Sequence, residues 1–99
     1  ALDDAGMPIG WRHRVVTTQA GQPQPGAVDL GDTLGAGELP YAGIAAVRAE
    51  WAAARVPVPT RIWRSVGHSF NTFATEAFVD EIAGLRGADP LEFRARLLV

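Results

Sequence analysis

The chain contains no cysteine and no lysine, and it has two histidines among its 99 residues. The absence of cysteine excludes disulfide bonds, thiolate nucleophiles and cysteine-ligated metals. With His13 and His68 as the only histidines, no histidine-based metal site is predicted, because such sites gather three or four ligands. No apolar run reaches the roughly 20 residues that a membrane-spanning helix needs, and no signal peptide is predicted.

The charge balance is close to neutral, with nine basic and eleven acidic residues and a net charge of -2. Nucleic acids and anionic membranes favour a basic surface, so neither is expected as a partner. The length allows at most one small globular unit with a modest core.

At each end of the chain, the sequence predicts a secondary-structure element that is only partly present. Residues 3–6 have the composition of a tight hairpin turn, with Gly6 suited to positive φ, and only Ala1 and Leu2 precede that turn. The last helical pattern stops at residues 97–99 with no cap after it. We therefore expect a fragment of a longer polypeptide.

The first half of the chain predicts strands around a long irregular segment. Residues 1–18 predict a hairpin and its outgoing strand, because apolar and polar side chains alternate there. Residues 19–43, rich in glycine and proline, predict an irregular loop. Residues 44–62 predict a strand over 45–53, followed by a proline segment that must be extended.

Residues 70–99 predict two helices. In the first helix, apolar residues recur with a period of 3.6 and predict one buried stripe, made of Phe70, Phe73, Ala74, Ala77, Phe78, Ile82 and Leu85. Ser69 or Asn71 is expected to cap the start of this helix, and Gly87 to follow its end. Asp89, with a proline behind it, predicts the cap of the second helix. Strands followed by two C-terminal helices predict an α+β fold that is a piece of a larger domain.

The junction at residues 63–69 is the strongest candidate for a functional site. An aromatic, a permanent cation and a glycine precede a helix start, whose backbone N–H groups favour an anionic or oxygen-rich ligand. Gly67 allows close approach of a ligand, and Arg64 offers a planar fork of donors. The alternative is that Trp63 and Val66 belong to the core and that Arg64 is an ordinary surface residue.

Two further features have competing interpretations. Glu76 and Asp80 lie one helical turn apart, where paired-carboxylate catalysis is possible, but a solvated or partner-facing stripe is favoured. The two helices also suggest a helix-turn-helix-like binding or adaptor module, in which Arg94 and Arg96 would contact phosphate.

Residues 63–69, 71–83 and 87–94 together resemble the molybdopterin-binding large subunit of the xanthine dehydrogenase and aldehyde oxidase family. Within that family, the sequence is most similar to the isoquinoline 1-oxidoreductase beta subunit. Residues 39–41 and 47–51 resemble the segment that precedes this loop in the same branch, and the N-terminal hairpin resembles its preceding strand pair.

The resemblance implies a molybdenum hydroxylase, which inserts oxygen from water into an aldehyde or an N-heterocycle and passes electrons to an iron–sulfur small subunit. It implies a molybdopterin cofactor, in a dinucleotide form, in the whole protein and none bound to this fragment. It places six residues beside the substrate pocket and the cofactor, namely Trp63, Arg64, Ser65, Val66, Gly67 and His68. Arg64 would be the pocket residue, while Val66 stands where other branches have an aromatic that stacks on substrate. The family's catalytic glutamate matches no residue here, so the isolated chain is expected to be inactive.

Overall fold

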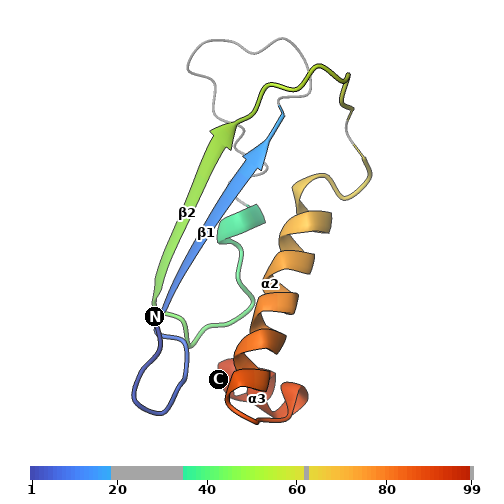
Figure 1. Ribbon diagram of the computed structural model, residues 1–99. Coiled ribbons are helices and arrows are strands. Elements are labelled where there is room, and N and C mark those ends of the chain that lie inside the picture. The colour runs from blue at the N-terminus through green and yellow to red at the C-terminus, as the bar shows by residue number, and fades with distance from the viewer. Residues whose placement is uncertain (19–34, 62, 99) are drawn as a thin grey trace.

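The computed structural model describes residues 1–18, 35–61 and 63–98. Its elements are β1 (Gly10–Thr17), β2 (Ala46–Ala53), α2 (Gly67–Leu85) and α3 (Pro90–Leu97), with a short helical turn at residues 35–37. The two strands form a sheet, α2 lies along one side of it, and α3 lies at the end of α2 (Figure 1). The predicted α+β class is confirmed. Of the irregular loop expected over residues 19–43, residues 19–34 lie outside the described part of the chain.

Both predicted strands are present, and they pair in parallel. The register runs from Gly10 opposite Ala46 to Thr17 opposite Ala53. The indole N–H of Trp51 donates to the hydroxyl of Thr17 at 2.9 Å and holds the ends of the strands together. The long connection between the strands permits the parallel direction, because a short hairpin loop can join only antiparallel neighbours.

The N-terminal hairpin turn is confirmed. Gly6 has a φ of 77°, and Leu2 pairs with Pro8 in an antiparallel bridge. The guanidinium of Arg86 donates to the carbonyl of Ala5 at 2.9 Å. The turn is therefore tied to the residue that follows α2.

The hydrophobic core lies at one end of an elongated molecule, whose principal extents are 46 × 22 × 20 Å. It forms where the start of β1, residues 39–44, the second half of α2 and α3 meet (Figure 1). Its buried members are Trp11, Tyr41, Ile44, Val79, Ile82, Ala83, Phe93 and Leu97. The opposite end, which carries residues 63–66, holds none of these side chains.

The face of α2 that packs against the rest of the chain differs from the prediction. The buried residues of the helix are Gly67, Asn71, Thr75, Val79, Ile82 and Ala83. Of the predicted stripe only Ile82 is buried, whereas Phe73 is 76% exposed and Leu85 is 88% exposed. The predicted stripe is therefore wrong. The reason is a close approach, since a Cβ placed on Gly35 would lie 3.1 Å from the side-chain nitrogen of Asn71, which leaves no room there for a phenylalanine ring.

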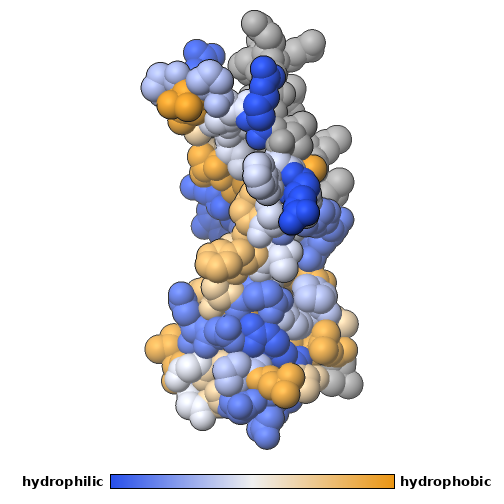
Figure 2. All heavy atoms as spheres, turned by 90° about the vertical axis from the view of Figure 1, so that its right-hand side faces the viewer, coloured by the Kyte–Doolittle hydropathy of each residue, from blue (hydrophilic) through white to orange (hydrophobic). Residues whose placement is uncertain are grey.

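The aromatic side of α2 consequently faces outward. Figure 2 looks onto this side of the molecule and shows apolar side chains at the surface, interspersed with charged ones. Phe78 contacts Trp11 in an edge-to-face arrangement, with 5.4 Å between the ring centroids. Phe70 and Phe73 lie further toward the start of the helix and remain exposed.

The helix ends agree with the prediction except at the start of α2. Gly87 has a φ of 61° and follows α2 as expected. The carboxylate of Asp89 accepts the N–H groups of the first turn of α3, as predicted for its cap. The start of α2 was predicted wrongly, because Val66 occupies the cap position and no side chain caps it. The hydroxyl of Ser69 donates to the carbonyl of Val66 at 3.0 Å and lies within the helix.

One carboxylate organises the outer face of the sheet. Glu50 accepts hydrogen bonds from Arg12 and Arg14 on the neighbouring strand, each at 2.9 Å, and its other oxygen lies 2.7 Å from Nε of Arg48. The hydrogen bond from Arg12, together with that from Arg14 and the charge of Arg48, lowers the pKa of Glu50 to about 2 against the opposing effect of desolvation. This cluster ties β1 to β2.

We predict that the Glu50 cluster makes the free energy of unfolding decrease at acidic pH. Because the folded-state pKa of Glu50 is lowered, its contribution is fully present above its ordinary pKa and is lost as the pH falls from about 5 toward 2. Urea unfolding across this range should show a shallower fall of the unfolding free energy for Glu50→Gln than for the parent chain. Glu92→Gln, an exposed change on α3, should keep the parent slope, and equal slopes for all three chains would contradict the prediction.

Candidate functional site

The junction before α2 adopts a rare backbone conformation. Ser65 and Val66 have φ values of 68° and 44°, and the N–H of Val66 donates to the carbonyl of Trp63 at 3.1 Å. A β-branched residue in this region of backbone space is an outlier that costs on the order of 1 to 3 kcal/mol. Such strain clusters at ligand-binding and catalytic segments, which makes this loop a candidate functional segment.

The side chains of the loop extend away from the core. Trp63 is 77% exposed and Val66 is 50% exposed, and Arg64 and Ser65 are exposed as well. The alternative that Trp63 and Val66 are core residues is therefore wrong. Within the described part of the chain, Arg64 forms no ion pair, and its guanidinium remains available.

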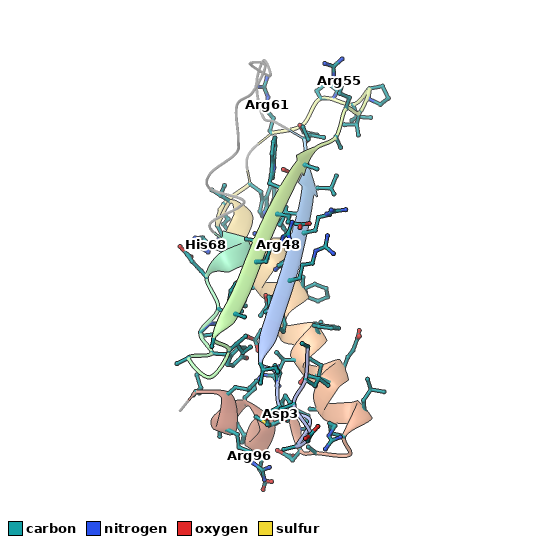
Figure 3. The ribbon with its side chains drawn as sticks, turned by 90° about the vertical axis from the view of Figure 1, so that its left-hand side faces the viewer. Asp3, Arg48, Arg55, Arg61, His68 and Arg96 are labelled. Carbon is teal, nitrogen blue, oxygen red and sulfur yellow. The ribbon has the colours of Figure 1, made fainter. Side chains whose placement is uncertain are left out.

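The last two predicted site residues lie closer to the body of the molecule. Gly67 is buried and lies against the turn at residues 35–37, where a Cβ on Gly35 would be 3.7 Å from its carbonyl carbon. The imidazole of His68 reaches toward Glu38, with 3.6 Å between Nδ1 and the nearer carboxylate oxygen. Figure 3 shows His68 beside this turn. The structure thus places Gly67 and His68 beside the turn at residues 35–37, although the His68 side chain is as exposed as the loop at residues 63–66.

A pocket of about 470 Å³ opens between residues 35–40 and the first half of α2. Its lining residues are Gly35, Glu38, Leu39, Pro40, His68, Thr72, Thr75 and Glu76. Of the six predicted site residues, only His68 reaches this pocket. Sequence reasoning missed Thr72 and Thr75 because both lie off the apolar stripe, and no motif marks them.

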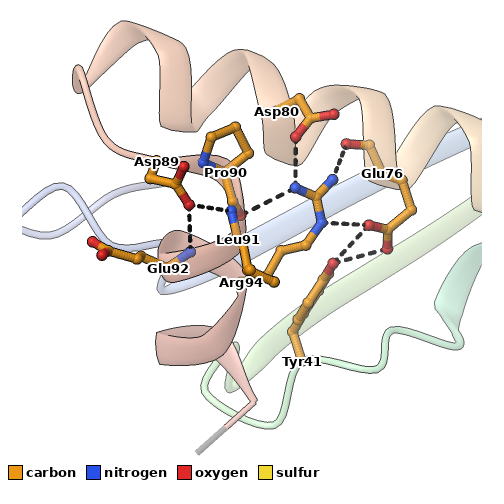
Figure 4. Close-up of polar contacts among 8 residues, drawn as sticks. All are labelled: Tyr41, Glu76, Asp80, Asp89, Pro90, Leu91, Glu92 and Arg94. Carbon is orange, nitrogen blue, oxygen red and sulfur yellow. Dashed lines mark hydrogen bonds and ion pairs between the residues drawn. The ribbon is translucent and has the colours of Figure 1, made fainter.

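The two carboxylates one turn apart on α2 are bridged by an arginine of α3 (Figure 4). Nε of Arg94 donates to Glu76 at 2.8 Å, and Nη1 donates to Asp80 at 2.5 Å. The hydroxyl of Tyr41 donates to the same Glu76 carboxylate at 2.8 Å. The bridge connects three segments of the chain, so the two carboxylates are not a free pair, and the Asp80 side chain is still 54% exposed at the surface.

The bridge also sets the ionisation of its members. The hydrogen bond to Asp80, followed by that to Glu76, raises the pKa of Arg94, and the same guanidinium lowers the pKa of Asp80. Burial, and then the hydrogen bond to Glu76, raises the pKa of Tyr41. Of the two residues that the helix-turn-helix alternative assigns to phosphate, Arg94 directs its donors at carboxylates, whereas Arg96 is exposed.

His13 is part of the packed side of β1. Burial lowers the pKa of its imidazole, and a hydrogen bond to the backbone of Ala36 opposes this effect. Among the described residues, no group of three or more His, Cys, Asp or Glu side chains is arranged to hold a metal ion. None of the helices in this part of the chain combines the length and apolar character needed to cross a membrane.

We predict that Arg94 stabilises the fold. Arg94→Met should lower the unfolding free energy by about 1 kcal/mol, because it removes the hydrogen bonds that join the partly buried Glu76 carboxylate of α2 to α3. Arg96→Met on the same helix is the matched control and should change stability by less than about 0.5 kcal/mol, because Arg96 is exposed. Thermal or urea unfolding of the two variants measures the difference, and equal losses would contradict the bridge.

Comparison of the chain with protein-family models, with curated proteins and with solved structures gives no match in any of the three.

Proposed function

We propose that this chain is part of the molybdopterin-binding large subunit of a molybdenum hydroxylase, and that residues 63–68 form a wall of its substrate pocket. The proposal takes its family from the resemblance over residues 63–94. The observation that supports it in the structure is the exposed, strained loop at the start of α2, with Arg64 available beside Trp63.

The exposed apolar surface around this loop supports a role within a larger body of protein. Trp63, Phe70 and Phe73 are 77%, 41% and 76% exposed, and all belong to the loop or to the first two turns of α2. Large apolar side chains gathered at one end of a small domain mark a contact surface. In this proposal the remainder of the large subunit covers the aromatic side of α2 and completes the pocket.

The chemistry of the loop fits an anionic, oxygen-rich cofactor. Residues 63–69 contain Arg64 and His68 as ionisable side chains and no carboxylate, and they lead into the N-terminus of a helix 19 residues long. Both the permanent cation and the helix terminus favour a negatively charged group. When bound, the molybdenum cofactor supplies the oxygen transfer and accepts the electrons. Arg64 would hold an oxygen of the cofactor or the substrate, and Trp63 would exclude water beside it.

We predict that Arg64→Ala in the complete heteromer lowers kcat/KM by about tenfold or more, in the range expected for loss of a charge-assisted contact. The unfolding temperature should stay unchanged because the Arg64 side chain is exposed. Arg96→Ala, also exposed but on α3, is the matched control and should leave the kinetics unchanged. Unaltered turnover in Arg64→Ala would remove the pocket role.

The family assignment has a separate test. The complete reading frame around this sequence should encode the rest of a large subunit, and the purified heteromer should contain molybdenum and iron by metal analysis. A reading frame that begins just before Ala1 and stops just after Val99 would defeat the assignment, whatever the kinetics of Arg64→Ala.

We also predict that Phe73 acts in assembly and not in the fold of the chain. Phe73→Ser should change the stability of the isolated chain by less than about 0.5 kcal/mol, because the ring is 76% exposed, but it should lower the yield of assembled heteromer. Val79→Ser, on the buried side of the same helix, should instead destabilise the isolated chain by about 2 kcal/mol or more. Equal losses of stability in the two variants would show that the aromatic side is packed within the chain.

A further inference from the structure

The sheet has an open edge along β2. β2 lies outermost on its side of the molecule in Figure 1, and none of its eight residues is buried. Among the described residues, no hydrogen bond beyond the ladder with β1 involves the backbone of residues 46–53. An exposed row of unpaired N–H and C=O groups is a template for another strand.

The direction of the backbone groups identifies which residues form that row. The N–H of Ala54 donates to the carbonyl of Thr17 on β1 at 2.9 Å. Because successive residues of a strand direct their N–H and C=O groups to opposite edges, the odd-numbered residues of β2 direct theirs away from β1. The available donors and acceptors are those of Val47, Ala49, Trp51 and Ala53.

The charges on β2 favour a second copy of this chain as the occupant. Arg48 and Glu50 lie on the outer face of the sheet, on either side of Ala49. In an antiparallel pairing with Ala49 opposite its own copy, Arg48 of each chain faces Glu50 of the other. A shift by one pair in either direction would place Arg48 opposite Arg48, or Glu50 opposite Glu50, and like charges in register are destabilising. The charge pattern therefore selects one register.

The other face of the sheet agrees with that register. Val47 comes to lie opposite Trp51 of the second copy, and a β-branched residue opposite an aromatic is a favourable cross-strand pair. Val47 is 43% exposed in the single chain, so this contact would remove apolar surface from water. The free edge of β1 does not offer the same match, because an equivalent pairing there would bring Arg12 opposite Arg14.

The surroundings of Arg48 also favour the pairing. In the single chain the residue directly opposite Arg48 across the ladder is Arg12, another cation. The Arg48 side chain is 75% exposed and reaches Glu50 only along its own strand. Figure 3, which looks onto the side of the molecule where β2 lies, shows Arg48 at the sheet surface.

From this geometry we propose that two copies of the chain associate through antiparallel pairing of their β2 edges, centred on Ala49, to form a continuous four-stranded sheet. The association is isologous, since each chain contributes the same surface. This inference does not rest on the proposed molybdenum chemistry.

The register can be tested by cross-linking, because the chain has no cysteine of its own. In the proposed pairing, residue 49 lies about 5.5 Å from its copy between Cα atoms, which is within the range of a disulfide. Ala49→Cys should therefore form a covalent dimer on mild oxidation. Ala52→Cys is the matched control and should remain monomeric on a non-reducing gel, because Ala52 lies opposite Ala46 of the other copy.

The charge pairing can be tested by sedimentation over a dilution series. Arg48→Glu should raise the dimer dissociation constant by about tenfold or more, because it places like charges opposite each other twice in the dimer. The variant should stay folded, since the introduced carboxylate would face Arg12 within its own chain. Arg96→Glu makes the same charge change at an exposed position on α3, away from the sheet, and should leave the dissociation constant within about twofold of the parent.

Three results would overturn the proposal. The parent chain could remain monomeric throughout the dilution series, which would show that the β2 edge does not pair with a second copy. Ala52→Cys could cross-link as readily as Ala49→Cys, which would mean another register or random collision. Arg96→Glu could weaken the dimer as much as Arg48→Glu, which would show a general charge effect and rule out the specific contact between Arg48 and Glu50.

Discussion

The close approach between α2 and the helical turn at residues 35–37 governs much of this structure. A Cβ on Gly35 would lie 3.7 Å from the carbonyl carbon of Gly67 and only 3.1 Å from the side-chain nitrogen of Asn71. A helix that comes this near to neighbouring backbone must present small or polar residues to it. The aromatic residues of α2 are consequently turned outward, and the surface beside residues 63–66 becomes apolar.

Two ion clusters hold the remaining segments together, and they are built in opposite ways. On the sheet, a single carboxylate, Glu50, gathers three guanidinium groups from both strands. At the other end, a single guanidinium, Arg94, joins two carboxylates of α2 and, through Glu76, the segment that carries Tyr41. Each cluster links parts of the chain that are distant in sequence. These charged residues are paired within the chain, whereas Arg64 at the exposed loop forms no ion pair among the described residues.

The open surfaces of the molecule follow from this arrangement. Packing is concentrated where α3 meets the start of β1, whereas the other end exposes the strained loop and the first turns of α2. The edge of β2 is open because the sheet has only two strands among the described residues. Because the core lies at one end of the molecule, it leaves uncovered both the apolar surface near residues 63–73 and the edge of β2. They lie on different sides of the molecule and make independent contacts possible.

The sequence by itself determined the turns, helix caps and strands that depend only on neighbouring residues. Gly6 and Gly87 take positive φ values, and Asp89 caps α3 ahead of its proline. The alternation of apolar and polar residues predicts the bounds of β1 and β2 to within one or two residues of those observed. Each of these features depends on residues that are neighbours in the chain. The tertiary structure alone decided the parallel pairing, the side of α2 that is buried and the bridge formed by Arg94. A helix with apolar residues on one side and small residues on the other has two faces that can pack, and only the backbone it meets determines which one does.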